Sequence, residues 1–228
     1  MLYEHPTYRI MGDRALLVEL GDRISPLVNK KVRELFLCLK NNRVEGVVEA
    51  VPSYRSLLIV YDPLKITLSA HKEWLKKYHT TIDRSEIPKP RTLEIPVVYG
   101  GEYGPVLDWV AEFHRVPPEE IIRLHTGTTY RVYMIGFTPG FAYMGQLPEA
   151  IATPRRETPR TAVPRGSVGI AQNQTGVYPV KSPGGWQIIG RTTLRLFDPE
   201  KWPPTPLEMG DLVKFLSIKE EEMTRWEV

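Results

Sequence analysis

The sequence predicts an α+β unit followed by a mainly β unit that forms a closed or nearly closed barrel. Three observations support this prediction. Runs with strand and helix periodicity alternate as far as Tyr78. Most of the 21 prolines in this chain of 228 residues lie after Ile87. Beyond that point the apolar runs are short and are separated by glycine and proline turns, which is typical of barrels.

The N-terminal unit is predicted to be a sheet with two helices. Gly12-Asp13 marks the turn of a strand pair over Tyr8–Leu20. Ser25 is placed as the N-cap of a helix that begins at Pro26 and ends at Asn41-Asn42. Two further strands and a second helix are expected at Val44–Val51, Leu57–Tyr61 and Leu68–Tyr78. The order strand, helix, strand, strand, helix is that of a ferredoxin-like unit.

The second unit is predicted to hold two helices and a series of short strands. A strand at Thr92–Val98 either completes the first sheet or starts this unit, in which the strand is placed at Glu94–Tyr99. The helices span Pro105–His114 and a segment that begins at Val116-Pro117-Pro118 and ends near Gly127. Later strands are expected at Thr129–Ile135, Ser167–Ala171, Val177–Val180, Trp186–Gly190 and Asp211–Ile218.

The segment TIDRSEIPKPR, residues 81–91, is polar, charged and proline-bearing, and it is the best candidate for a linker. We therefore expect a ferredoxin-like domain at residues 1–85, a linker at 86–91 and a β-barrel domain at 92–228.

Composition excludes several classes of protein. A net charge of +3 over this length is too small to indicate nucleic-acid binding. No stretch approaches the roughly 20 apolar residues that cross a membrane, and the N-terminus lacks the apolar run of a signal peptide. Cys38 is the only cysteine, so no internal disulfide can form. We expect a cytoplasmic protein that binds neither nucleic acid nor membranes.

Several catalytic motifs are absent from the sequence. It contains no Gly-x-x-x-x-Gly-Lys-Ser/Thr phosphate loop, no His-Glu-x-x-His zinc helix and no Gly-x-Ser-x-Gly elbow. Cys38 lies between two leucines, which favours a structural thiol. His71 and His79 flank Trp74 on a lysine-rich helix, where a solvated face is favoured over a metal site because no third ligand is evident. No metal site is predicted.

The stretch from Tyr133 to Phe197 holds the candidate chemistry. Between Ile151 and Phe197 a single acid, Glu157, stands against many bases. The bases are Arg155, Arg156, Arg160, Arg165, Lys181, Arg191 and Arg195. Because guanidinium groups bind planar oxyanions through two hydrogen bonds, this excess favours a carboxylate, carbamate or phosphate ligand. The alternative is that the arginines coat the rim of the barrel and pair with acids elsewhere.

Two loops in this stretch are candidates for supporting a ligand. The first places two phenylalanines and a tyrosine around a shaped turn at Gly136, Phe137, Thr138, Pro139, Gly140, Phe141, Ala142 and Tyr143. The second, Pro183-Gly184-Gly185-Trp186, either turns its backbone amides toward a ligand with Trp186 as a wall or is a tight turn that leads into a strand. His125 is the only histidine near these segments. A core or capping role is favoured for it, although its ordinary pKa near neutrality keeps a general acid/base role open.

Several motifs in this region resemble those of one family. They are GFTPGFAYMG, TPRRETPRTAVPRGSVGIA, QTGVYP and SPGGWQIIGRT. They are similar to motifs of the allophanate hydrolase subunit 1 family, also called the family of the 5-oxoprolinase B-type subunit or the Kip inhibitor family (carboxyltransferase domain, subdomains C and D). The resemblance covers nearly the whole chain, with MGDRALLVELGD, VPSYRSLLIVYDP and IPVVYGGEYGPVLDWVA as its N-terminal and middle blocks. These motifs are specific for the family but not for one activity within it.

The resemblance implies a ferredoxin-like domain followed by a cyclophilin-like β-barrel domain. It implies that the chain is the B-type subunit of an ATP-dependent 5-oxoprolinase, which opens 5-oxo-L-proline to L-glutamate together with an A-type subunit and a homologous C-type subunit. It also implies two alternatives. One is a carboxyltransferase-type subunit that acts on urea-like amides, with biotin on a partner. The other is a binding module that inhibits a sensor histidine kinase.

The same resemblance implies a small anionic or amide substrate. The expected lining residues are Tyr143, Arg155, Arg160, Gln174, Trp186 and Arg191. Arg155 or Arg160 would hold an oxyanion, and Trp186 would stack on the substrate. Tyr143 and Gln174 would hydrogen-bond the amide.

Overall fold

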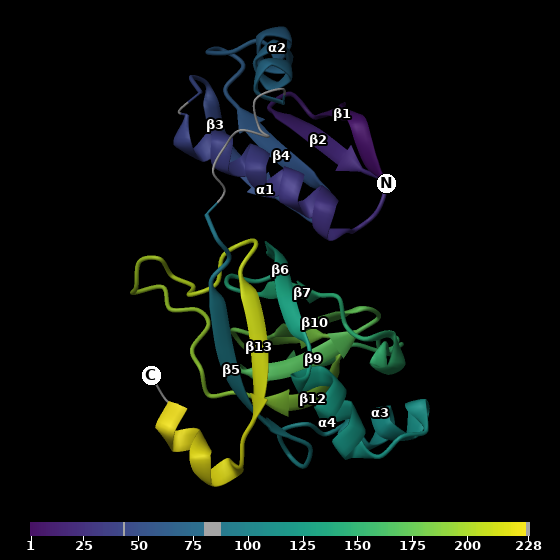
Figure 1. The fold of residues 1–228 in the computed structure, drawn as a ribbon. Helices are drawn as coiled ribbons and strands as arrows, with labels where there is room; N and C mark the ends of the chain where they lie inside the picture. The colour runs from purple at the N-terminus through teal and green to yellow at the C-terminus, as the bar shows by residue number, and fades with distance from the viewer. Residues whose placement is uncertain (43, 80–87, 227–228) are drawn as a thin grey trace. The chain divides into compact units, whose positions relative to one another are not determined.

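The structure, a computed structural model, describes residues 1–42, 44–79 and 88–226, and the chain divides into two compact units, Met1–Lys89 and Pro90–Val228 (Figure 1). The expected domains at 1–85 and 92–228 stay predictions. Part of the expected linker, residues 86 and 87, lies outside the described residues. In the described part of the chain, no helix has the length and apolar character that crossing a membrane requires.

The N-terminal unit is a four-stranded antiparallel sheet with two helices. Its strands, β1 (Leu2–Met11), β2 (Ala15–Gly21), β3 (Val47–Pro52) and β4 (Ser56–Tyr61), lie in the order β1-β2-β4-β3. The helices are α1 (Pro26–Asn41) and α2 (Leu68–His79). Alternate residues of β2 and β4, such as Leu16 and Ile59, are fully buried and form one apolar face. The buried stripe of α1, which includes Val28 and Val32, packs against this sheet.

This arrangement confirms the ferredoxin-like prediction and answers the question about the strand near Glu94. The strand that pairs with the outer side of β2 is β1, at the N-terminus. The segment Thr92–Tyr99 forms β5, which belongs to the barrel. Ser25 caps α1 as predicted, because its hydroxyl accepts a hydrogen bond of 3.2 Å from the amide of Val28.

The prediction of a solvated face for His71 is wrong. His71 is fully buried, its ring lies 5.5 Å from that of Tyr61, and neither ring nitrogen has a hydrogen-bond partner among the described residues. Burial lowers the pKa of His71 below its ordinary value. The side chain of His79 lies outside the described residues. Among the residues that the structure covers, no cluster of His, Cys, Asp or Glu could hold a metal ion.

The C-terminal unit is a closed barrel of seven strands. They are β5 (Thr92–Tyr99), β6 (Thr129–Ile135), β7 (Ala142–Gly145), β9 (Ser167–Ala171), β10 (Gln174–Val177), β12 (Gln187–Arg191) and β13 (Leu212–Ser217). Their order around the barrel is β10-β7-β6-β13-β5-β12-β9. The pair β5–β13 is parallel, and the other pairs are antiparallel. Closure removes exposed strand edges from this unit.

Shorter elements surround the barrel. A two-stranded sheet joins β8 (Arg160–Val163) to β11 (Ser182–Gly184). The helix α3 (Leu107–His114) packs against β12, and α4 (Pro118–Thr126) packs against β13. A single turn of 3₁₀ helix lies at η2 (Glu149–Ile151), and a longer 3₁₀ helix lies at η3 (Glu220–Trp226).

The prediction of individual strands is correct in part. β6 and β9 have the expected bounds, β5 begins two residues earlier than expected, and β12 and β13 differ by one residue at each end. The expected strand Val177–Val180 is wrong, because β10 ends at Val177. The strands β7, β8 and β11 were not predicted. They have only three or four residues each, which is too short for a periodic pattern to show.

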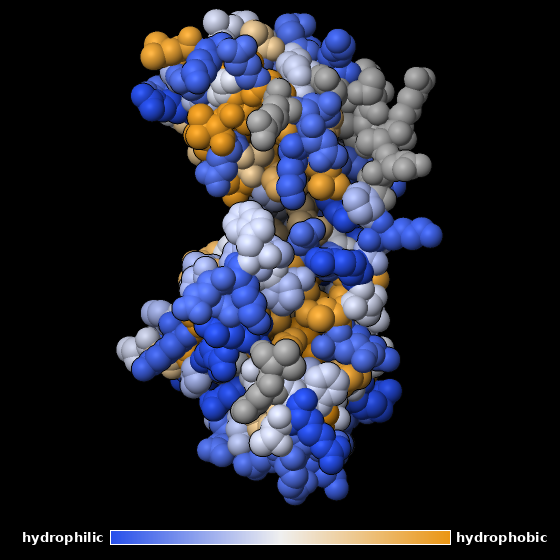
Figure 2. All heavy atoms as spheres, turned by 90° about the vertical axis from the view of Figure 1, so that its left-hand side faces the viewer, coloured by the Kyte–Doolittle hydropathy of each residue, from blue (hydrophilic) through white to orange (hydrophobic). Residues whose placement is uncertain are grey.

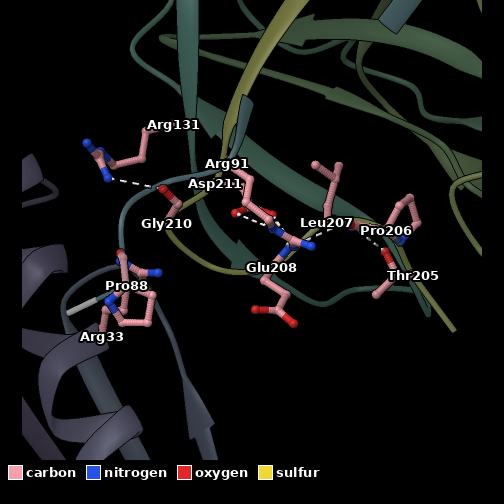
Figure 3. Close-up of polar contacts among 10 residues, drawn as sticks. All are labelled: Arg33, Pro88, Arg91, Arg131, Thr205, Pro206, Leu207, Glu208, Gly210 and Asp211. Carbon is pink, nitrogen blue, oxygen red and sulfur yellow. Dashed lines mark hydrogen bonds and ion pairs between the residues drawn. The ribbon is translucent and has the colours of Figure 1, made fainter. Parts of the chain in front are cut away.

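A buried carboxylate holds the loop before β13 to the start of β5. Asp211 is 4% exposed and accepts two hydrogen bonds from the Arg91 guanidinium, at 3.3 and 2.7 Å, and a third from the Glu208 amide at 2.9 Å (Figure 3). Arg131 of β6 donates to the neighbouring carbonyl of Gly210 at 3.2 Å. Charge-assisted bonds of this kind order the loop that brings the last strand into the barrel.

The surface of each unit mixes apolar and hydrophilic side chains, as Figure 2 shows for one face. On the N-terminal unit a hollow of about 590 Å³ lies over α1 and β3. It is lined by Phe36, Leu39, Lys40, Val44, Glu45, Val47, Val48, Glu49 and Ala50. None of these residues was predicted to bind a ligand; the predicted site residues all lie in the barrel unit.

Candidate functional site

A cavity of about 230 Å³ in the barrel unit is lined by aromatic, glycine and proline residues from three segments of the stretch Tyr133–Phe197. We call it the aromatic cage and define it by its lining: Phe137, Phe141, Tyr143, Arg155, Pro159, Tyr178, Pro183, Gly184, Gly185 and Trp186. A small concave site with rigid apolar walls and a few polar groups is the usual form of a metabolite site.

Phe141 is the centre of the cage walls. Its ring meets those of Tyr143, Tyr178 and Trp186 edge-on, with ring centroids 4.8, 5.2 and 5.4 Å away. Phe141 is 1% exposed and Trp186 is 4% exposed, so these rings are held on all other sides by the core. Edge-to-face contacts fix the orientation of each ring, and the cage walls are therefore rigid.

Phe137 stands at the mouth of the cage on a strained turn. The amide of Thr138 donates to the carbonyl of Gly136 at 2.9 Å, and φ at Phe137 is 68°. A turn closed over three residues with a positive φ at its centre is uncommon and strained for a residue other than glycine. The turn leaves Phe137 62% exposed, and the centroid of its ring lies 5.8 Å from that of Phe141.

Glycines let the backbone approach the cage closely. A Cβ atom on Gly184 would lie 2.3 Å from the hydroxyl oxygen of Tyr178. A Cβ atom on Gly176 would lie 3.0 Å from the Phe141 ring and 3.2 Å from the Trp186 ring. At Gly176 the carbonyl oxygen of Ala142 would also lie 3.0 Å away, so close neighbours restrict both positions and their φ values do not. At Gly185, by contrast, the nearest heavy atom would be 3.7 Å away.

Three arginines contact Trp186 or the neighbouring Gly185, two through their guanidinium groups and one through its backbone amide. The Arg155 guanidinium lies 5.8 Å from the centroid of the Trp186 ring. Nη1 of Arg160 donates to the carbonyl of Trp186 at 2.9 Å, and the backbone amide of Arg156 donates to the carbonyl of Gly185 at 2.8 Å. Burial lowers the pKa of the Arg160 guanidinium, and the charge of Arg156 adds to this effect.

Five of the six arginines of this region lack an acidic partner among the described residues. Arg195 pairs with Asp198 at 3.4 Å. No described residue forms an ion pair with any of the other five, Arg155, Arg156, Arg160, Arg165 and Arg191. Within the described part of the chain, the alternative that the arginines pair with acids elsewhere holds for Arg195 and not for these five. Arg155 is the one arginine of these five that lines the cage, so its charge lies beside the cavity without a described acid as partner.

Two tyrosine hydroxyls face this charge. Burial raises the pKa of Tyr143, and the charge of Arg155 partly offsets the effect. Burial likewise raises the pKa of Tyr178. A hydrogen bond with the backbone of Trp186 and the charges of Arg155 and Arg160 partly offset this effect. Both hydroxyls are therefore protonated at neutral pH and can donate a hydrogen bond to a ligand oxygen.

Not every residue that the sequence singled out lines the cage. Gly136, Pro139 and Gly140 shape the first loop without lining it, and Arg160 lies behind Trp186. Gln174 is buried on β10, where its backbone pairs with β7 and β9. The guanidinium of Arg191 lies over the Tyr103 ring at 5.6 Å, outside the cage lining.

His125 belongs to the barrel core. It is fully buried, its Nδ1 lies 2.7 Å from the Tyr99 hydroxyl, and its Nε2 lies 2.9 Å from the Thr175 hydroxyl. Burial lowers the pKa of His125 to about 3, so the ring is neutral at physiological pH. The structure thus places His125 in the core role that the sequence favoured and does not bring it to the cage.

Two lining residues, Pro159 and Tyr178, were not predicted from the sequence. Tyr178 lies within QTGVYP, a motif of the family resemblance in which the tyrosine had no assigned role. A buried aromatic residue directly after a glycine-containing strand was the available signal. Its close approach to Gly184 could not be inferred from the sequence because it depends on how the segment after β10 folds back onto β11.

A second cavity of about 600 Å³ adjoins the cage, since Arg155 lines both. We call it the Trp109 groove and define it by its lining: Val106, Trp109, Phe113, Pro154, Arg155, Arg156, Glu157, Thr158 and Gln187. Trp109 and Phe113 lie one turn apart on α3 and stack on each other at 5.5 Å. The periodicity of this helix predicted its buried stripe but gave no signal that the aromatic pair outside that stripe would line a cavity.

Known proteins with similar sequences share this architecture. The family model described as "Carboxyltransferase domain, subdomain C and D" matches residues 6–207. The chain is 40% identical to the B-type subunit of 5-oxoprolinase from Bacillus subtilis, over 93% of this chain and 92% of the relative. It is 41% identical to the B-type subunit of 5-oxoprolinase from Escherichia coli O157:H7, over 92% of this chain and 95% of the relative.

A solved structure supports the same assignment. The fold matches the crystal structure of TTHA0988 with a TM-score of 0.80 and 33% identity, over 90% of this chain. This chain spans only 40% of the TTHA0988 chain, so the activity of that whole protein is not carried over. With a family model that covers most of its length and relatives of this identity, the chain belongs to the family of carboxyltransferase domains, subdomains C and D.

Proposed function

We propose that this chain is the B-type subunit of an ATP-dependent 5-oxoprolinase and that the aromatic cage binds 5-oxo-L-proline. The observation that supports this most directly is the cage itself, a small cavity with flat aromatic walls and, at its edge, a guanidinium that forms no ion pair with any described residue. The similarity to B-type subunits of 5-oxoprolinase over most of both chains supports the same function.

The chemistry of the substrate fits the cage. 5-Oxo-L-proline joins a flat lactam to a carboxylate. The lactam ring is placed against Trp186, and Arg155 receives the carboxylate through two parallel hydrogen bonds. The hydroxyls of Tyr143 and Tyr178 donate to the lactam oxygen, where negative charge develops when the amide bond is attacked. The buried walls exclude bulk water, which strengthens each of these interactions.

The same lining explains why the chain needs partners. None of the described residues that line the cage is a carboxylate, a histidine or a lysine, so the cage has no ordinary general base. ATP, when bound in the complex, supplies the phosphoryl group that activates the lactam oxygen. The residues of this chain bind and orient the substrate and hold its carboxylate. The A-type and C-type subunits are assigned the remaining groups of the active site.

Reconstitution tests this function. Mixed with the A-type and C-type subunits, ATP and 5-oxo-L-proline, the chain is expected to give L-glutamate and ADP. The Trp186→Ala variant should raise the KM for 5-oxo-L-proline, with assembly checked by gel filtration. If the three subunits assemble but no glutamate forms, the proposed function is wrong.

The other expectations stay predictions. A carboxyltransferase acting on urea-like amides would consume urea only with a biotin-carrying partner, and a kinase inhibitor would bind a histidine kinase in the absence of the A-type and C-type subunits. Cytoplasmic localisation also stays a prediction.

A further inference from the structure

We propose that the Trp109 groove binds the adenine nucleotide, with the base on the Trp109–Phe113 pair and the phosphates at Arg155 and Arg156. The inference rests on the proposed function, in which ATP is a co-substrate, and it adds the place where this chain holds that nucleotide. The groove adjoins the cage and shares Arg155 with it, and its other lining residues have no role in the proposed binding of 5-oxo-L-proline.

The aromatic pair offers a surface for a flat base. Trp109 is 45% exposed and Phe113 is 50% exposed, although both are large and apolar. Their rings are stacked with an angle of 28° between the planes, so together they form one continuous aromatic surface. Phe113 also meets the ring of His114 edge-on at 4.9 Å, which holds the pair in place. A purine can stack on such a surface because every base has an aromatic face.

The charge of the groove suits a polyphosphate. Arg155 and Arg156 are exposed, both line the groove, and neither forms an ion pair with a described residue. Glu157 is the one acid of the lining, which also includes Thr158. Nε of Arg156 donates to the carbonyl of Thr158 at 3.3 Å, and the other guanidinium donors of Arg156 have no partner among the described residues. Guanidinium groups bind phosphate oxygens through paired hydrogen bonds.

The position of the groove relates the two ligands. Arg155 lines both cavities, so a phosphate that it holds lies at the boundary with the cage. The groove volume of about 600 Å³ is within the usual range for a ligand the size of a nucleotide, whereas the cage at about 230 Å³ suits a smaller molecule. The arrangement places a terminal phosphate beside the site of the lactam.

Nucleotide binding measured directly tests the inference. ADP and the non-hydrolysable analogue AMP-PNP, each with Mg²⁺, are titrated by calorimetry into the full chain and into its complex with the A-type and C-type subunits. We expect Trp109→Ala and Arg156→Gln each to weaken binding about tenfold, because each removes one contact with the base or the phosphates. The matched controls are Trp202→Ala and Arg165→Gln, which change exposed residues outside both cavities and should leave binding unchanged.

The outcomes separate this inference from the proposed function. Weaker nucleotide binding in the two groove variants alone supports the inference, whether or not glutamate forms. Equal binding in all four variants overturns it even if the complex makes glutamate. The inference is also overturned if neither the chain nor the complex binds nucleotide, or if the groove variants lose only their assembly with the other two subunits.

Discussion

Arg155 lies at the boundary between the two cavities of the barrel unit. It contacts the Trp186 ring, lines two cavities and has no acidic partner among the described residues. An arginine on a surface usually finds a carboxylate or remains fully solvated. A guanidinium that lies against an aromatic ring and has no acidic partner is preorganised to bind an anion, because the ring contact already restricts the conformational entropy of the side chain.

Replacing Arg155 should weaken substrate binding. In the reconstituted enzyme, Arg155→Gln should raise the KM for 5-oxo-L-proline about tenfold or more, since one charged hydrogen bond contributes about 1.5–3 kcal/mol. The control is Arg123→Gln, which removes an exposed surface pair with Glu120 and should leave KM unchanged. An unchanged KM in the Arg155 variant would show that the carboxylate binds elsewhere.

Two adjacent glycines offer a matched test of the cage geometry. Gly184→Ala places a methyl group 2.3 Å from the Tyr178 hydroxyl oxygen and should destabilise the protein by about 1–3 kcal/mol, because a packed wall must move. Gly185→Ala meets its nearest atom at 3.7 Å and should be close to neutral. Thermal unfolding and the KM for 5-oxo-L-proline measure both effects. Equal behaviour of the two variants would contradict the described position of Tyr178.

At the scale of elements, helix ends and helix faces determine how each unit is built. α1 begins at a serine cap followed by proline and buries one apolar stripe on the sheet. α4 presents His125 to the barrel interior, where the ring lies 4.5 Å from that of Phe215 on β13. The position of α1 thus follows from local sequence signals. The position of α4 depends on His125, a polar residue that the barrel encloses.

The cap of α1 should contribute a measurable part of the stability of the N-terminal unit. Ser25→Ala removes the acceptor for the Val28 amide and should cost about 1 kcal/mol. Ser25→Asp restores an acceptor and should recover most of this loss. Denaturant unfolding of the full chain, followed by far-UV circular dichroism, provides the measurement. A neutral alanine variant would indicate that the amide finds another acceptor.

Buried histidines should make the fold sensitive to acid. The pKa of His125 is about 3 in the folded protein and about 6.5 when unfolded, so below pH 6.5 the unfolded state binds a proton that the folded state does not. Stability should therefore be fully present above about pH 6.5 and should fall by about 1.4 kcal/mol per pH unit as the pH decreases toward 3.

The variant His125→Gln isolates this contribution. It should be less stable at pH 7, because the contacts with Tyr99 and Thr175 change, but its stability should depend less steeply on pH. His71 and His114, whose pKa values burial also lowers, still contribute in both proteins. Unfolding free energies from urea titrations between pH 4 and 7 provide the comparison. Identical slopes would show that His125 is not buried as described.

At the scale of the molecule, each unit has a separate core. The main barrel cluster runs from Ile95 to Phe215, and the cage cluster from Phe141 to Ile188, both within the second unit. Neither cluster includes a residue of the N-terminal unit. The candidate site likewise draws all its lining residues from the barrel.

The barrel unit should therefore fold alone. A fragment of residues 90–228 is expected to show a cooperative thermal transition and β-rich circular dichroism, since a closed barrel with its own core has the size of an ordinary domain. Near-UV circular dichroism should retain the signal of the cage aromatics. A fragment that stays unfolded would show that the barrel depends on the N-terminal unit.

Much of this organisation can be predicted from the sequence, because some signals are local. The caps and periodicity of α1, the alternation in β2 and β4, and the change in proline content after Ile87 each depend on neighbouring residues alone. The glycine, aromatic and arginine motifs also identified the stretch that forms the cage and the family to which the chain belongs.

Other features were decided only by the tertiary structure, because they depend on residues far apart in the chain. The short strands β7, β8 and β11 exist through their pairing partners. Of six similar arginines, packing placed Arg155 against Trp186, Arg191 against Tyr103 and Arg195 beside Asp198. The sequence by itself determined that arginines and aromatic residues would concentrate in one stretch, and the fold decided which of those side chains line a common cavity.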